Sequence, residues 1–164
     1  MIAEKARRIV ALTPEKAYTQ AATRCAQREY CRADWSQKWL RAGLSAEAVE
    51  KVLMQLEREG FIDENRYARA FVHDKFNYDH WGRMKMRAAL QQKGLSASDI
   101  AEALSTIDED AYREMLQSVL TAKGRTLQGV EGYERKQKLA RFAAGRGFEA
   151  SLVFRALDMA DDEC

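Results

Sequence analysis

A short pattern of glycine, apolar residue and serine constrains this chain more than any other feature. At Leu90, Gly94, Leu95, Ser96 and Ile100 it predicts the end of one helix and the start of the next. Glycine accepts the left-handed conformation just past a helix end, where the following apolar residue contacts the last turn. The serine then caps the next helix, and the leucine before it packs on the isoleucine. The pattern therefore predicts a helical corner.

The same intervals occur three times along the chain. The other copies are Trp39, Gly43, Leu44, Ser45, Val49 and Leu53, and Ala143, Gly147, Phe148, Glu149, Val153 and Leu157. The three glycines lie 51 and 53 residues apart, a regularity typical of repeated supersecondary units. The third copy is weaker because Glu149 is a poor N-cap. We interpret it as the terminal copy.

Helix-favouring residues are plentiful and there is one proline, so we expect an all-α fold. We predict an N-terminal arm at 1–14 and three tandem three-helix repeats at 15–60, 61–107 and 108–164. Thr13 and Pro14 open the first helix, which we expect to run to about Cys31. Units of about 50 residues are marginal alone, so neighbours should support one another in an elongated, curved array.

Composition excludes several classes of protein. No apolar run approaches the roughly 20 residues that span a membrane, so we expect a soluble, cytoplasmic protein. Cys25, Cys31 and Cys164 have no zinc-like spacing, and His73 and His80 have no cysteine near them, so we expect reduced thiols, no metal and no cofactor. We find no arrangement of nucleophile, base and orienting group, and expect no enzyme.

The net charge is only +2, but its distribution is uneven. The predicted middle helices, 33–42, 81–93 and 133–146, hold eleven Lys or Arg against two acids, whereas the last helices, 45–59, 96–107 and 149–160, hold three against eight. A solvated face explains any single run, but recurrence favours a polyanion or an acidic protein groove as partner. The candidate partner-binding residues are Arg28, Arg83, Lys85, Arg87, Lys93, Arg135, Lys136, Lys138, Arg141 and Arg146.

Other interpretations compete with this one. Six aromatic residues have helical spacing, which favours core packing over stacking on nucleic acid bases: Trp35, Trp39, Tyr67, Phe71, Phe142 and Phe154. The glycine corner also matches a DNA-binding helix-turn-helix. In that motif the helix after the glycine enters the major groove, yet here this helix is the acidic one in every copy. Repulsion from phosphates puts this alternative second.

Four groups of residues occur in a specific order and spacing: Arg28, Glu29 and Tyr30; Gly60, Phe61, Ile62, Asp63, Glu64, Tyr67, Ala68 and Phe71; Leu90, Lys93, Gly94, Leu95 and Ile100; and Lys136, Gln137, Lys138, Leu139, Phe142, Arg146, Gly147 and Phe148. Together they resemble the RecX family of bacterial regulators of the RecA recombinase, over roughly residues 17–160. Cys31, Asp34, Trp35 and Glu64 depart from the family pattern, at positions that affect caps and packing.

The resemblance implies three tandem three-helix repeats and a monomeric, non-enzymatic modulator in DNA repair and the SOS response. Such a protein lies in the groove of the RecA filament on single-stranded DNA and limits its growth, recombinase and co-protease activities. The basic middle helices would face acidic filament surface or the DNA itself. We expect that reversing Arg83, Lys85 and Arg87 together weakens filament binding and leaves thermal unfolding nearly unchanged.

Overall fold

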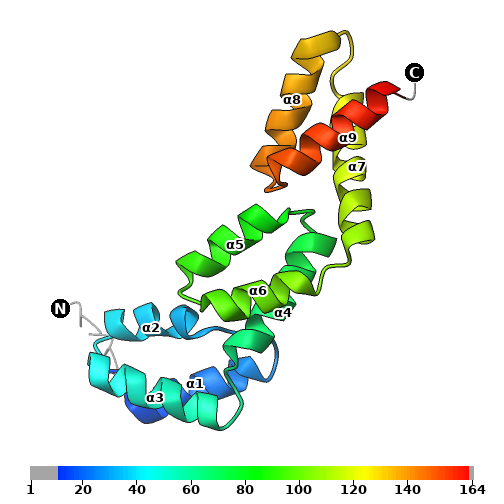
Figure 1. Ribbon diagram of the computed structural model, residues 1–164. Helices are drawn as coiled ribbons and strands as arrows, with labels where there is room; N and C mark the ends of the chain where they lie inside the picture. Colours follow the sequence, from blue (N-terminus) through cyan, green and yellow to red (C-terminus); the bar gives the residue numbers. More distant parts are fainter. Residues whose placement is uncertain (1–10, 163–164) are drawn as a thin grey trace, which may run out of the picture. The chain divides into compact units, whose positions relative to one another are not determined.

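Nine α-helices and no strand make up residues 11–162, the part of the chain that the computed structural model describes (Figure 1). The helices are α1 (Pro14–Cys25), α2 (Arg32–Arg41), α3 (Ala46–Arg58), α4 (Glu64–Asn77), α5 (Arg83–Gln92), α6 (Ala97–Ser105), α7 (Glu109–Arg125), α8 (Gly132–Gly145) and α9 (Ala150–Asp162). The predicted all-α class is confirmed. Most of the predicted N-terminal arm, and Cys164, lie outside the described residues.

The three glycine corners form as predicted. Gly43, Gly94 and Gly147 have φ values of +97°, +77° and +96°, in the left-handed region. After each glycine, the backbone N–H of the apolar residue donates to the carbonyl five residues earlier, in the pairs Leu44 to Trp39 (3.1 Å), Leu95 to Leu90 (3.3 Å) and Phe148 to Ala143 (3.1 Å). These bonds define a Schellman cap, which satisfies carbonyls that the helix end leaves free.

Short polar side chains cap the helices that follow. Ser45 and Ser96 each accept a hydrogen bond from the backbone N–H three residues later, at 3.1 Å. Asp63 accepts from Arg66 N–H at 3.0 Å, and Asp108 begins α7 in the same way. Each cap satisfies one donor of the first helical turn. The capping predictions are confirmed at all four positions.

The predicted extent of the first helix is wrong, because α1 ends at Cys25 and not near Cys31. The residues after it have partners that a continuous helix would not reach. The Tyr30 ring lies 4.9 Å from that of Trp35, and Glu29 accepts from the Arg66 guanidinium at 2.5 Å. The Cys31 backbone N–H then donates to the Asp34 carboxylate at 2.9 Å, so α2 begins here.

The chain divides into two compact units, one up to Tyr67 and one from Ala68. In the first unit, α1 and α2 both pack on α3. Its core consists of ten buried residues: Ala17, Ala21, Trp35, Trp39, Leu44, Val49, Val52, Leu53, Leu56 and Ile62. The division falls inside α4, whereas the predicted repeat boundaries after residues 60 and 107 stay a prediction, as does the elongated array.

In the second unit, α5 packs on α6, and α7, α8 and α9 pack on one another. Tyr112 and Phe148 belong to its core, with ring centroids 5.2 Å apart. The aromatic residues predicted to pack inside mostly do so in both units. Trp35, Trp39 and Tyr67 are buried, and Phe71 and Phe142 are half-buried. The prediction is wrong for Phe154, which is 55% exposed on α9.

Candidate partner-binding surface

The first turn of α5 contacts the corner at the end of α8 through its backbone. The Gly82 N–H donates to the Arg146 carbonyl at 2.7 Å, and the Met84 N–H donates to the Gly147 carbonyl at 2.9 Å. Backbone N–H groups at the start of α5, which have no partner within that helix, thus donate to carbonyls at the end of α8. A Cβ on Gly82 would lie 2.3 Å from the Gly147 carbonyl carbon, so glycine is required at this approach.

Arg83 lies at the centre of a polar cluster beside this contact. Its guanidinium pairs with Glu109 at 2.6 Å and with Glu149 at 2.7 Å, and lies 3.9 Å from the centroid of the Tyr112 ring. The Tyr112 hydroxyl donates to Glu149 at 2.6 Å and accepts from the Arg83 backbone N–H at 3.1 Å. Only 20% of the Arg83 side chain is exposed. Arg83 therefore joins α5 to α7 and α9.

This environment stabilises the charged arginine and the neutral tyrosine. Partial burial of Arg83 opposes its charge, but hydrogen bonds to Glu149 and Glu109 raise its pKa above the ordinary value. Burial, followed by the hydrogen bond to Glu149, raises the pKa of Tyr112. We therefore expect reversal of Arg83 to lower stability, in contrast to the expectation from the sequence for the triple variant.

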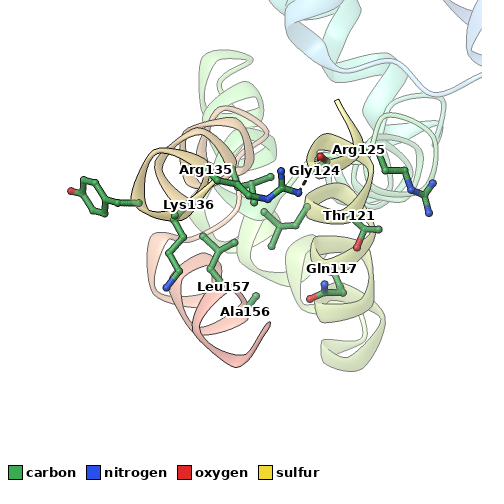
Figure 2. Close-up of a pocket in the computed structure, with 12 residues that line it drawn as sticks. Gln117, Thr121, Gly124, Arg125, Arg135, Lys136, Ala156 and Leu157 are labelled. Atoms are coloured by element: carbon green, nitrogen blue, oxygen red, sulfur yellow. Dashed lines mark hydrogen bonds between the residues drawn. The ribbon is translucent and has the colours of Figure 1, made fainter. Parts of the chain in front are cut away.

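Two predicted basic residues of α8, Arg135 and Lys136, also have partners inside the fold. Arg135 donates to the carbonyls of Gly124 (3.1 Å) and Leu127 (3.0 Å), and so fastens the loop that follows α7. Figure 2 shows Arg135 reaching from α8 toward Gly124 of α7. Arg135 and Lys136 line a cavity of about 740 Å³ between α7, α8 and α9. The Lys136 ammonium nitrogen also lies 3.6 Å from a carboxylate oxygen of Asp158 on α9.

Four further predicted residues make local contacts. Lys138 pairs with Glu134 at 3.3 Å, one turn earlier on α8. Three cations lie over aromatic rings: Lys85 over Trp81 (4.4 Å to the centroid), Arg28 over Tyr30 (4.3 Å) and Arg146 over Phe142 (5.3 Å). Such contacts are weak at exposed sites, so the exposed Arg28 stays available to a partner. The Arg146 guanidinium also donates to the Asp79 carbonyl, at 2.9 Å.

Arg87 on α5 and Arg141 on α8 differ from the other predicted residues. Both side chains are exposed, and neither has an acidic partner among residues 11–159. The Arg87 guanidinium contacts the sulfur of Met84, at 3.7 Å. Lys93, the last predicted residue of α5, is half-buried at its C-cap. The cations best placed for an outside partner are therefore Arg87 and Arg141.

Reasoning from the sequence missed three members of the polar cluster, namely Glu109, Tyr112 and Glu149. Two signals were present. Tyr112 follows the cap Asp108 at the same interval as Tyr67 follows Asp63. Glu149 occupies the position of the capping serines, and its carboxylate holds Arg83 and Tyr112. A charged residue at a capping position indicated a partner elsewhere in the fold.

Two classes of site are absent from the described part of the chain. It contains no group of three His, Cys, Asp or Glu side chains that could hold a metal ion. None of its helices is long and apolar enough to cross a lipid bilayer. Cys25 and Cys31 are unbridged thiols.

The described residues define an all-α protein with basic side chains on its middle helices. Residues 63–104 match the model of the second three-helix domain of RecX, and residues 110–157 match the model of the third. Regulatory protein RecX of Chlorobium phaeobacteroides (strain BS1) is 34% identical over 144 residues, which cover 88% of this chain and 93% of that protein. The chain belongs to the RecX family.

Other relatives agree with this assignment. Regulatory protein RecX of Pseudomonas putida (strain GB-1) is 32% identical over 83% of this chain and 85% of its own. A crystal structure of regulatory protein RecX has a TM-score of 0.80 and 26% identity, covering 88% of this chain and 71% of that one. The crystal structure of RecX from Lactobacillus salivarius, at 15% identity, matches in fold with a TM-score of 0.79 over 90% of this chain and 96% of that one.

Proposed function

We propose that this protein binds the groove of the RecA filament on single-stranded DNA and mainly inhibits its recombinase, ATPase and co-protease activities. Membership in a family of regulatory proteins supports a regulatory role. The observation that carries the proposal is the pair of exposed arginines, Arg87 and Arg141, on two of the three basic middle helices. Exposed cations without internal partners attract an anionic surface at little cost in desolvation.

The DNA in the proposed filament partner is anionic. Single-stranded DNA carries one phosphate charge per nucleotide, and binding of cations to it releases condensed counterions. An arginine that already pairs inside the fold, such as Arg83, contributes little to such binding. Arg87 and Arg141 can bind phosphates or carboxylates with both arms of the guanidinium. We therefore assign direct contact with the filament to them first.

The alternative is a helix-turn-helix-like module that binds duplex DNA independently of RecA. It requires α3, α6 or α9 to enter the major groove. Exposed acids on these helices include Glu47 and Glu50 of α3 and Glu102 of α6. Their charge opposes contact with phosphates. This alternative has no supporting observation beyond the shape of the corner.

ATP hydrolysis by RecA on single-stranded DNA tests the proposal. Increasing amounts of the protein are added to RecA, ATP and a circular single-stranded DNA, and the rate of hydrolysis is followed. We expect the rate to fall as the protein approaches stoichiometry with RecA. Unchanged hydrolysis at stoichiometric protein contradicts the proposal. Tight binding to bare duplex DNA with a steep salt dependence would favour the alternative.

A further inference from the structure

A second, smaller cavity lies on another face of α7, between this helix, α8 and the loop after α4. Its volume is about 470 Å³, within the roughly 300–1,000 Å³ typical of ligand sites. The residues that give it its chemistry are His80, Met115, Val119, Lys123, Phe142 and Arg146. We call it the Phe142 cavity. It shares only Arg146 with the predicted partner-binding residues.

The Phe142 cavity combines an apolar interior with a cationic rim. Lys123 Nζ and the Arg146 guanidinium carbon lie 4.9 Å and 5.3 Å from the centroid of the Phe142 ring. The guanidinium of Arg146 also donates to the Asp79 carbonyl at 2.9 Å, which fixes its position. None of the residues that line the cavity is acidic. The rim therefore attracts a negatively charged group.

The wall that His80 contributes is under backbone strain. His80 has a φ of +56°, the one positive value outside glycine among residues 11–162. Its ring Nδ1 lies 3.0 Å from the sulfur of Met115. Conformations of this kind cost on the order of 1–3 kcal/mol and gather at binding and active sites. The contact with Met115 places the imidazole at one side of the cavity.

We propose that the Phe142 cavity binds a short acidic peptide segment of a partner protein. A large apolar side chain of the peptide enters the cavity, where the thioether of Met115 adapts to its shape. A neighbouring carboxylate of the peptide pairs with Lys123 and Arg146 at the rim. The assignment rests on the complementarity of charge and apolar surface, and it does not depend on RecA being the partner.

A nucleic acid base fits this cavity less well. Stacking of a base requires a free aromatic face. Lys123 and Arg146 already lie over the Phe142 ring, and the other aromatic ring of the cavity, His80, contacts the sulfur of Met115. An aliphatic or aromatic side chain of a peptide needs only apolar contact, which these residues supply. The cavity therefore favours peptide over nucleotide.

Fluorescence anisotropy tests the proposal with the labelled peptide amide fluorescein-Gly-Ser-Asp-Phe-Asp-Gly. We expect saturable binding that weakens with salt. Replacement of the peptide's Phe by Ala, or of both Asp by Asn, should weaken it at least about tenfold. The protein variant Ala122→Trp fills the mouth of the cavity from an exposed position, and Lys123→Met removes one rim charge. Both should weaken binding by a similar factor.

The control variant is Arg125→Met, which removes an exposed cation from the same helix outside the Phe142 cavity. It should leave peptide affinity within about twofold of wild type. Circular dichroism melts establish that each variant is folded before binding is measured. Equal affinity of wild type and both cavity variants overturns the proposal. A second result would also overturn the proposal: the peptide does not bind, whereas a labelled oligothymidylate binds and Ala122→Trp weakens its binding.

Discussion

Two corners with the same local structure differ in what surrounds them. Gly43, in the unit up to Tyr67, and Gly147, in the unit from Ala68, have φ values of +97° and +96°. A Cβ on Gly43 would meet no atom within 4 Å, whereas one on Gly147 would lie 2.4 Å from Lys85 Cβ and 2.6 Å from Lys85 N. The same pattern of residues thus serves as a free turn in one unit and as a contact surface in the other.

Replacement of each glycine by alanine is expected to give the largest difference between the two corners in the free energy of unfolding. Gly43→Ala adds only the cost of the left-handed conformation, about 1–2 kcal/mol. Gly147→Ala adds the same cost and also forces α5 away from the corner, so we expect a loss of at least about 3 kcal/mol. Urea unfolding of both variants measures the two losses. Equal losses would show that the contact between α5 and the α8 corner does not form.

Substitution of two arginines at equivalent positions, 51 residues apart, is expected to give a smaller difference in the free energy of unfolding. Arg83 pairs with Glu149 under the Tyr112 ring, and its side chain is 20% exposed. The Arg32 side chain is 29% exposed, and its partners Glu50 and Glu57 are more exposed than Glu149. We expect Arg83→Met to lower the free energy of unfolding by about 2–3 kcal/mol and Arg32→Met by less than about 1 kcal/mol. Thermal melts followed by circular dichroism compare them, and a larger loss for Arg32→Met would contradict the account.

The smallest effect concerns the pH dependence of the same cluster. Burial and the Glu149 hydrogen bond raise the pKa of Tyr112, so the folded state retains the phenol proton at a pH where the unfolded chain loses it. The resulting stability is present below pH of about 10 and is lost as pH rises further. Between pH 9 and 11, wild type should lose about 1 kcal/mol more than Tyr112→Phe.

The control for this measurement is Tyr78→Phe, at a tyrosine that is 74% exposed. This variant should follow the wild-type pH profile. Urea unfolding at several pH values gives the profiles. If Tyr112→Phe follows the wild type as well, the hydroxyl of Tyr112 has no raised pKa and the polar cluster is weaker than its geometry implies.

The corners could be predicted from the sequence because the hydrogen bonds that form them are local. A Schellman cap and a serine cap involve residues within six positions of the glycine, and the residue types themselves determine the geometry. The end of α1 could not be predicted in the same way. It depends on Glu29 meeting Arg66, 37 residues away. Propensity alone favours a longer helix there.

The candidate surface also depends on contacts between residues far apart in the sequence, which the sequence alone does not predict. Arg83 and Arg87 stand one turn apart on α5 and look alike in the sequence. Arg83 finds carboxylates 26 and 66 residues away, whereas Arg87 has no acidic partner among the described residues. Charge counting located the basic helices but could not separate cations that hold the fold from cations that face outward. That separation depends on tertiary packing.

Arg87 and Arg141 are the residues that we propose to contact the RecA filament. The most direct test is fluorescence anisotropy of the labelled protein with filaments assembled on single-stranded DNA with a non-hydrolysable ATP analogue. The variant Arg87→Glu with Arg141→Glu is compared with Lys51→Glu plus Arg58→Glu, which makes the same change in net charge on α3. We predict a loss of affinity of at least about tenfold for the first variant and less than about twofold for the second. Equal affinities of the two variants would contradict the claim.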